Sequence, residues 1–414
     1  MVLAVTNPPS PRQVPNVRIT ALASHPVMYQ SQLYRLVAAN PLVELTVIFA
    51  SNAGVRPYRD TGFGGHIIEW DQDLLAGYTH SFLGRAKRNR VDRFFDLADW
   101  DVVHHITRDR CDVLWVHSYS FLTLWLAIVA AKARGIPVMI REEQTLLHRR
   151  PWWKEGFRAL ILRTLFKGVS GLAIGSNNRA FFQHYGVPEH RIHLVPYTTD
   201  NEDWQRQARD LAQTRDSIRT LLGIPAGSPA ILFVGKLLPK KQPGLLLAAF
   251  EKVRKVLPCS LVLVGLGELE QELHRIVAQN TIPDVIFVGF QNRSEISRAF
   301  AAADVFVLPS AKNETWGMVV NEAMNFGLPV IVSDRVGCAP DLVRSGANGY
   351  VFDHRSTQEL ADAIAKLVSD PGLRQRFGRR SLEIITLWSP RSAADGLVAA
   401  ALASIVGTPS ADRN

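Results

Sequence analysis

The chain has 414 residues, is 47% hydrophobic and carries a formal net charge of +9. This length and composition are typical of a globular protein with two or three domains, each of which buries a full core. The three cysteines, Cys111, Cys259 and Cys338, are odd in number and widely spaced. They exclude a disulfide framework and a cysteine metal site, and they favour reduced thiols in a cytosolic setting.

The N-terminus shows neither the basic nor the apolar segment of a signal peptide, and residues 7–11 are expected to form a disordered lead-in. The longest apolar helical stretch, residues 121–131, falls short of the roughly 20 residues that a membrane span needs. We therefore expect a cytoplasmic protein that is soluble or bound peripherally to the cytoplasmic face of a membrane.

In the first half, short β-branched runs alternate with longer amphipathic stretches, which is the pattern of βαβ units around a parallel sheet. Helices are predicted over residues 121–134, ending at Gly135 and Pro137, and over residues 151–166. Strands are predicted over residues 18–23, 42–49, 113–117, 138–141, 171–174 and 192–195.

A polar stretch, residues 198–219, interrupts this alternation, and a helix is predicted over 204–220. A hinge between two domains is expected within residues 198–228. Beyond it the alternation resumes, with strands predicted over residues 230–234, 260–264, 285–288, 305–308 and 328–332. The sequence thus predicts two doubly wound Rossmann-like domains, the first over residues 1–205 and the second over residues 206–388. Residues 389–414 begin with Ser389 and Pro390, a good helix start, and the helix could pack back on the N-terminal domain.

Open parallel sheets bind ligands at the carboxyl ends of their strands, so the expected site is a cleft between the two domains. Gly235 follows the strand over 230–234, and Lys236 and Lys241 come directly after it. Two ammonium groups suit a diphosphate, whose leaving oxygens gain charge as a glycosyl bond breaks. The alternative is a surface loop with ordinary lysines. Phe290, after the strand over 285–288, could lie against a nucleobase or in the core.

The strand over 305–308 is followed by a loop that carries Glu314 and by a helix that begins near Gly317 and contains Glu322. Free N–H groups at the start of this helix predict an anion site. The two carboxylates could accept hydrogen bonds from two sets of sugar hydroxyls. Two glutamates at this separation occur by chance about once in such a chain, so the strand–loop–helix context carries the assignment.

Four segments follow one another in order over about residues 230–350. They are FVGKLLPKK, VLVGLGELE, VIFVGF and ADVFVLPSAKNETWGMVVNEAMNFGLPVIVSDRVG. Together they resemble the donor domain of the family-4 retaining glycosyltransferases, which have the GT-B fold. The resemblance implies sugar transfer from a nucleoside diphosphate sugar, with no metal or other cofactor required.

The resemblance implies that the domain over 1–205 binds the acceptor and that the domain over 206–388 binds the donor, and it also assigns residues. Lys236 and Lys241 would bind the donor diphosphate, although the family usually has arginine at the first position and lysine lacks the bidentate fork of arginine. Glu314 would lie near the donor hexose, and Glu322 would hold the ribose hydroxyls. The implied donor-binding set is Gly235, Lys236, Lys241, Phe290, Glu314, Thr315, Trp316, Gly317, Met318, Val319 and Glu322.

The first half resembles the family more loosely. His117 ends a predicted strand and resembles the cleft histidine that contacts the donor sugar and supports the developing charge; otherwise it is a structural histidine. Together with Lys241 and Glu314 it forms the expected catalytic set. The segment from His25 to Gln30 stands where many members carry a glycine-rich turn, and it is similar to a segment of a bacterial subgroup. The expected acceptor or cleft residues are His25, Tyr29, Gln30, Arg141 and Glu142.

Two basic stretches, residues 85–93 and 148–167, combine lysine and arginine with neighbouring aromatic residues. They could lie on an anionic membrane surface, the alternative being helices packed on the domain. Two Asp-x-Asp segments, Asp71 to Asp73 and Asp99 to Asp101, match the pattern of metal-dependent transferases. About one such match is expected by chance, so neither is taken as a metal site.

The sequence therefore predicts a retaining transferase that moves a hexose-type sugar to a hydroxyl of a glycan, a lipid-linked or a small-molecule acceptor, in polysaccharide or glycolipid biosynthesis. Two alternatives stay open, namely a nucleotide-sugar epimerase of similar fold and a non-catalytic protein that binds nucleotide sugars. Only the net charge suggests a nucleic-acid partner, and no recognisable motif supports one.

Overall fold

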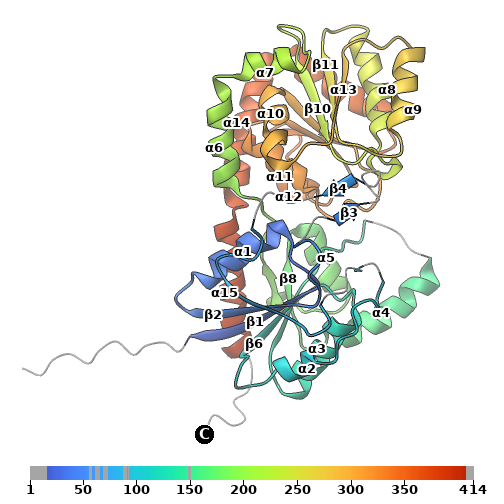
Figure 1. Ribbon diagram of the computed structural model, residues 1–414. Coiled ribbons are helices and arrows are strands. Elements are labelled where there is room, and N and C mark those ends of the chain that lie inside the picture. The colour runs from blue at the N-terminus through green and yellow to red at the C-terminus, as the bar shows by residue number, and fades with distance from the viewer. Residues whose placement is uncertain are drawn as a thin grey trace, which may run out of the picture.

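The computed structural model describes residues 16–55, 58–60, 66–68, 73–86, 91, 93–147 and 151–406. It consists of two α/β domains, one above the other in Figure 1, each built on a parallel sheet with helices on both faces. The expected lead-in at 7–11, Asp71 and most of the basic stretch at 85–93 lie outside the described residues.

The N-terminal domain contains a seven-stranded parallel sheet in the order β5-β2-β1-β6-β7-β8-β9. Its strands are β1 (Val17–Ala23), β2 (Val43–Phe49), β5 (Thr79–Phe82), β6 (Val113–His117), β7 (Val138–Arg141), β8 (Ser170–Ala173) and β9 (Ile192–Leu194), and a separate antiparallel pair is formed by β3 (Tyr58–Asp60) and β4 (His66–Ile68). Its helices are α1 (Met28–Ala38), α2 (Val102–His105), α3 (Leu122–Ala133), α4 (Trp152–Phe166), α5 (Ser176–His184) and the 3-10 turn η2 (Glu189–Arg191).

The C-terminal domain contains a six-stranded parallel sheet in the order β12-β11-β10-β13-β14-β15. Its strands are β10 (Ala230–Val234), β11 (Ser260–Val264), β12 (Val285–Gly289), β13 (Val305–Leu308), β14 (Val330–Ser333) and β15 (Gly349–Phe352). Its helices are the 3-10 turn η3 (Pro239–Lys241), α8 (Pro243–Arg254), α9 (Glu270–Gln279), α10 (Arg293–Ala302), α11 (Met318–Asn325), α12 (Ala339–Leu342), α13 (Thr357–Ser369) and α14 (Pro371–Leu387).

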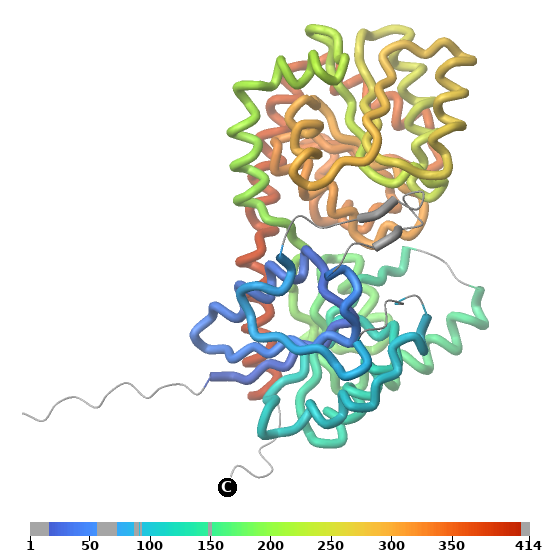
Figure 2. The backbone as a smooth tube through the Cα atoms, viewed as in Figure 1, coloured from blue at the N-terminus to red at the C-terminus, as the bar shows by residue number. Residues whose placement is uncertain are grey.

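The chain passes between the domains twice, as Figure 2 shows. The first passage leads into α6 (Asn201–Ala212) and α7 (Arg215–Leu221), and the buried Trp204 of α6 packs in the core of the C-terminal domain. The second leads from α14 into α15 (Pro390–Val406), whose buried face packs on α1 and on strands of the N-terminal sheet. The prediction of a single helix over 204–220 is wrong in one respect, because the structure has two helices that are separated by Gln213 and Thr214.

Every strand predicted from the sequence is present to within about two residues, but β5, β15 and the short antiparallel pair of β3 and β4 were missed. β5 lies at the sheet edge and carries His80 and Ser81, so it lacks the apolar run of a buried strand. β15 begins with Gly349, where a Cβ atom would lie 1.8 Å from the carbonyl oxygen of Val330. A glycine in a sequence argues against a strand, yet at this position only glycine permits the close approach of β14.

None of the described helices combines the length and apolar character that crossing a bilayer requires.

An ion-pair cluster ties α7 to the C-terminal sheet. Asp304, just before β13, accepts hydrogen bonds from Arg219 at 3.1 Å, Arg215 at 2.9 Å and the backbone N–H of Ala230 at 2.8 Å. The Arg219 side chain is only 8% exposed. Its positive charge is therefore compensated almost entirely by protein groups rather than by water.

We expect the substitution Asp304→Ala to lower the free energy of unfolding by about 3 kcal/mol, because it leaves a buried guanidinium without its counter-ion. Urea unfolding provides the measurement. Glu383→Ala is the control, since it removes one partner of the exposed Arg380–Glu383 pair and should cost less than about 1 kcal/mol. Equal losses in the two variants would contradict the structural role of Asp304.

Candidate active site

The carboxyl ends of the strands of both sheets face each other where the two domains meet (Figure 1). Several hydrogen bonds cross this junction. They run from Tyr29 Oη to Glu322 Oε1 at 3.0 Å, from Ser176 Oγ to Asp341 Oδ1 at 2.6 Å, from Asn177 Nδ2 to the Gly337 carbonyl at 2.9 Å, from Asn321 Nδ2 to the Tyr197 carbonyl at 3.0 Å and from Arg335 Nη1 to the Leu147 carbonyl at 2.7 Å. The cleft residues are thus held by long-range contacts.

In the C-terminal domain, Lys241 and Glu314 form a direct ion pair between Nζ and Oε2. Lys241 lies in η3, after β10, and Glu314 lies in the loop between β13 and α11, so adjacent strand ends bring them together. Ser310 Oγ donates a second hydrogen bond to the same carboxylate oxygen at 2.8 Å. Both charged side chains are largely buried, with 18% of Lys241 and 12% of Glu314 exposed. The lysine that was predicted to bind a diphosphate and the glutamate that was predicted to lie near the sugar are therefore neighbours.

The loops that follow β10 and β11 pack backbone to backbone, which is why they are glycine-rich. Gly265 has a φ of +133°, and a Cβ there would lie 2.1 Å from the carbonyl oxygen of Gly235. A Cβ on Gly267 would lie 2.5 Å from the carbonyl oxygen of Leu237. This contact fixes the path of the chain from Gly235 to the half-buried Lys236. Phe290, after β12, is half-buried.

The start of α11 provides N–H groups near the ion pair. Gly317 precedes the helix with a φ of +96°, a conformation that favours glycine, and it provides no side-chain cap. The first N–H groups of a helix have no partner within it, so those of Met318 and Val319 form a small positive region. The backbone of Thr315 rests against Gly337, where a Cβ would lie 1.8 Å from the Thr315 carbonyl oxygen.

Trp316 is buried at the domain junction and is 2% exposed. Its Nε1 donates to Asn321 Oδ1 at 2.8 Å, and its ring lies 6.3 Å from that of Tyr197 and 5.1 Å from that of Trp388. Of the implied donor-binding residues, Trp316 can therefore offer a ligand only its backbone groups. Its side chain instead orients the loop that carries Glu314.

Glu322, on α11, is 6% exposed and accepts the hydrogen bond from Tyr29 of the N-terminal domain. Burial raises the pKa of Glu322 to about 7, against a lowering effect of the Tyr29 hydroxyl and of Arg293. The same burial, together with the neighbouring carboxylate, holds the pKa of Tyr29 well above its usual range. Sequence reasoning identified both residues but did not foresee that they meet.

Arg293, which the sequence reasoning missed, lies between the two domains. Its guanidinium carbon is 4.8 Å from the centre of the Trp204 ring, and its Nη2 lies 3.3 Å from Asp203 Oδ2. Nη1 also contacts Met28 Sδ at 3.7 Å. No sequence pattern identifies it, because its partners come from α1 and α6.

His117, at the end of β6, is 5% exposed and packs against the rings of Trp115 at 4.5 Å and Tyr34 at 5.4 Å. Burial, and to a lesser degree the charge of Arg141, holds the pKa of His117 well below its usual range. Its Nε2 has no hydrogen-bond partner within the described part of the chain. A buried neutral imidazole with an unused nitrogen can bind a polar ligand.

Arg141 and Glu142, at the end of β7, differ in whether their side-chain polar atoms already have hydrogen-bond partners. Arg141 donates to the carbonyl oxygens of Val195 at 2.9 Å and Pro196 at 3.3 Å, so it stabilises the loop after β9. Glu142 Oε1 accepts from the N–H of Glu143 at 2.9 Å, while Oε2 is buried and finds no partner among the described residues. Burial raises the pKa of Glu142 to about 7. Arg141 thus binds backbone groups, whereas Glu142 keeps one buried oxygen for which the described residues offer no partner.

The remaining acceptor-side candidates are turned mainly toward their own domain. His25 Nδ1 lies 2.9 Å from Ser24 Oγ, and burial lowers the pKa of His25. Gln30 Oε1 accepts from the hydroxyl of Tyr34 at 3.4 Å. Within the segment from His25 to Gln30, Tyr29 and Met28 thus contact the C-terminal domain, Tyr29 through Glu322 and Met28 through Arg293.

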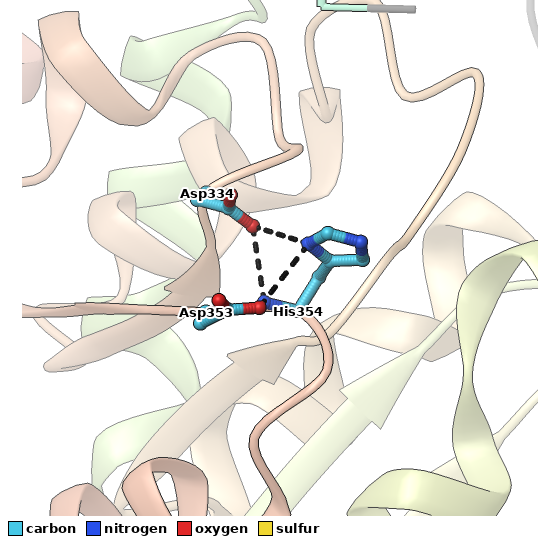
Figure 3. Close-up of side chains that lie close together, drawn as sticks. All are labelled: Asp334, Asp353 and His354. Carbon is cyan, nitrogen blue, oxygen red and sulfur yellow. Dashed lines mark hydrogen bonds and ion pairs between the residues drawn. The ribbon is translucent and has the colours of Figure 1, made fainter.

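Asp334, Asp353 and His354 cluster at the ends of β14 and β15 (Figure 3) and are the group of described residues whose atoms could surround a metal ion. His354 Nδ1 lies 2.8 Å from Asp334 Oδ1 and 3.5 Å from Asp353 Oδ1. Each carboxylate also faces an arginine, Asp334 facing Arg335 at 3.4 Å and Asp353 facing Arg355 at 2.7 Å. These ion pairs account for the cluster as a link between two loops.

The Asp-x-Asp segments also have structural roles where they are described. Asp99 is 3% exposed, and its carboxylate accepts hydrogen bonds from the N–H groups of Arg85 at 3.1 Å and Asp101 at 3.0 Å. Asp73 accepts from the N–H groups of Leu75 and Ala76. Both aspartates therefore stabilise local turns.

The second half of the chain has known relatives. Residues 214–383 match the family model described as Glycosyl transferases group 1. The D-inositol 3-phosphate glycosyltransferase of Xylanimonas cellulosilytica is 32% identical over 219 residues, which are 51% of this chain and 51% of that protein. The corresponding protein of Streptomyces bingchenggensis is 31% identical over 323 residues, or 73% of this chain and 65% of that protein. The chain spans about half the length of the first of these relatives.

A solved structure covers almost the whole chain. The Anabaena protein HepE in complex with UDP aligns with a TM-score of 0.69 and 19% identity over 94% of this chain and 100% of that one. At this identity the likeness concerns the fold, which with its two facing Rossmann-like domains is GT-B. The match to the group 1 family model and the similarity to the two glycosyltransferases support a glycosyltransferase.

Glu142→Gln provides a test of the buried carboxyl group. The raised pKa means that the folded state holds the Glu142 proton up to about pH 7, whereas the unfolded chain releases it near pH 4.5. Wild-type protein therefore loses stability as pH rises from about 4.5 to 7, and the neutral amide removes this loss. We expect the stability of the variant relative to wild type to increase by about 2 kcal/mol between pH 5 and pH 8.

Urea unfolding at the two pH values measures this difference. Glu383→Gln, which makes the same replacement at an exposed position, is the control. A pH-independent difference for Glu142→Gln would mean that Glu142 is ionised in the folded protein at neutral pH.

Proposed function

We propose that this protein is a glycosyltransferase that moves a hexose-type sugar from a nucleoside diphosphate sugar to a hydroxyl acceptor with retention of the anomeric configuration. The observation that carries the proposal is the largely buried Lys241–Glu314 pair beside the uncapped start of α11, at the strand ends that face the N-terminal domain. A cation, a carboxylate and free N–H groups there suit a diphosphate and the sugar attached to it.

Lys241 is proposed to bind the donor diphosphate, together with Lys236 and the N–H groups of Met318 and Val319. Without a ligand the charge of Lys241 is balanced by Glu314. A diphosphate would attract the ammonium group and leave the Glu314 carboxylate able to accept hydrogen bonds from sugar hydroxyls. Charge that develops on the leaving phosphate would then be stabilised by protein groups, with no metal ion needed.

Glu322 is proposed to hold the ribose of the donor. In the structure its carboxyl group already binds one hydroxyl, that of Tyr29. A ribose hydroxyl has the same hydrogen-bonding capacity and could take its place. A carboxyl group with a pKa of about 7 is partly protonated near neutral pH, so it could also donate a hydrogen bond.

His117 is proposed to contact the donor sugar through its unpartnered Nε2, and Glu142 to contact the acceptor through its unpartnered Oε2. In the transfer, the bond between the anomeric carbon and the phosphate oxygen breaks and a bond to the acceptor oxygen forms on the same face. The acceptor proton passes to the leaving phosphate oxygen, so no covalent enzyme intermediate is required. The neutral state of His117 supports this role, because a buried imidazolium would oppose the positive charge that develops on the sugar.

Lys241→Ala should lower kcat/KM at least about tenfold, which corresponds to about 1.4 kcal/mol of transition-state binding. Lys240→Ala is the matched control, because it removes the same charge from an adjacent, exposed residue and should change kcat/KM less than about twofold. Nucleoside diphosphate release with a matched donor gives the rate, and NMR of the product gives its anomeric configuration. Equal effects of the two substitutions would place the diphosphate elsewhere.

The donor is to be identified first, by thermal shift with UDP-, GDP- and ADP-sugars. A ligand present at 100 times its Kd adds about 2.7 kcal/mol to the stability of the folded state. Glu322→Ala should remove most of the shift that the matched donor produces. A donor-dependent shift without any product on offered acceptors would instead favour a binding protein.

A further inference from the structure

The outward side of α4 carries four large apolar side chains that water reaches. Trp152 is 85% exposed, Trp153 58%, Phe157 67% and Leu160 67%. Helical spacing places Trp153, Phe157 and Leu160 along one line, with Trp152 beside it. Figure 1 shows α4 at the margin of the N-terminal domain, projecting from it. Apolar side chains of this size, gathered on one helix face, indicate an interaction surface.

Positive charges flank this apolar line. Lys154, Arg163 and Lys167 are exposed, and Lys154 Nζ lies 5.0 Å from the centre of the Trp153 ring. The one acidic residue of the helix, Glu155, is directed toward the domain, where its carboxylate binds the hydroxyl of Tyr185 and faces Arg158. We use "outer face of α4" for Trp152, Trp153, Phe157 and Leu160 together with Lys154, Arg163 and Lys167. It thus combines aromatic and aliphatic groups with charge of a single sign.

The opposite side of α4 is fixed to the domain, so the outer face cannot turn inward. Leu162, Leu165 and Phe166 are buried in the core that α3 and α5 share. Arg158 donates to the hydroxyl of Tyr185 at 2.7 Å and to that of Tyr119 at 2.9 Å. The exposure of the aromatic line is therefore a property of the folded domain.

The composition of the outer face favours one class of occupant. In a symmetric dimer the same face of a second copy would bring like charges together, which opposes association. Nucleic acid would pair with the lysines and the arginine but would leave Phe157 and Leu160 without apolar contacts. An anionic lipid surface satisfies both features, because tryptophan, phenylalanine and leucine enter the boundary of headgroups and acyl chains while lysine and arginine remain at the phosphates.

We propose that the outer face of α4 docks the protein on anionic lipid bilayers, with the helix lying in the plane of the interface. Trp153, Phe157 and Leu160 enter the bilayer surface, and Lys154, Arg163 and Lys167 pair with lipid phosphates. The attachment is interfacial, consistent with the finding that no described helix is suited to span a bilayer. It is independent of the proposed sugar transfer and can be measured without any donor or acceptor.

Sedimentation with vesicles tests the proposal. The full chain should sediment with vesicles of phosphatidylcholine and phosphatidylglycerol, and the bound fraction should fall as NaCl is raised toward about 0.5 M. The triple variant Trp153→Ser, Phe157→Ser, Leu160→Ser should bind these vesicles at least about tenfold more weakly. Circular dichroism would establish that this variant is folded, as expected for substitutions of exposed side chains.

The matched control replaces equally exposed apolar residues of the C-terminal domain, with Leu221→Ser, Val256→Ser and Leu387→Ser in one chain. It should bind vesicles like wild type. The proposal is overturned if wild type does not sediment with anionic vesicles, if it binds pure phosphatidylcholine vesicles equally well, or if both triple variants lose binding alike. A wild-type dimer that the α4 variant converts to a monomer, without any vesicle binding, would instead identify a contact between copies.

Discussion

The geometry of the domain junction depends on the contacts of the buried Trp316 side chain. Its indole nitrogen binds Asn321, whose amide in turn binds the carbonyl of Tyr197 in the N-terminal half. Its ring packs between those of Tyr197 and Trp388, so both passages of the chain between the domains meet there. Glu314 precedes this residue by two positions, and α11 begins two positions after it. One side chain thus sets the position of the carboxylate loop, of the helix start and of the opposite domain.

Around this junction, buried ionisable side chains are accommodated in two different ways. Lys241 and Glu314 form a direct ion pair, so each of these largely buried side chains has a partner of opposite charge. Glu142 and Glu322 have no cation at hydrogen-bond distance among the described residues, and burial raises the pKa of each to about 7. Glu142 Oε2 finds no hydrogen-bond partner among the described residues, whereas Glu322 accepts a hydrogen bond from Tyr29, so burial without a counter-ion is what the two carboxyl groups share.

In the N-terminal domain, helix α4 contacts residues that lie close to the domain junction. Arg158 of α4 contacts Tyr119, which lies two residues after the cleft histidine His117. The loop from Glu142 to Leu147 connects the end of β7 with the region before α4, and its Leu147 carbonyl accepts from Arg335 of the other domain. The helix with the basic and aromatic outer face thus packs in the same core as the strands that end at His117 and Arg141.

The sequence by itself determined the alternation of strands and helices, the two sheets and the strand–loop–helix unit that carries Glu314 and Glu322. These features depend on apolar periodicity and on glycine and proline at element ends, which are local properties. It did not determine β15, where Gly349 is required by the approach of Val330, or the division between α6 and α7. Nor did it show that Tyr29 binds Glu322, 293 residues away, that Arg293 lies between α1 and α6, or that the aromatic line of α4 faces water. Those facts depend on how the two domains pack and on which side of each helix the cores cover, and only the tertiary structure decides that.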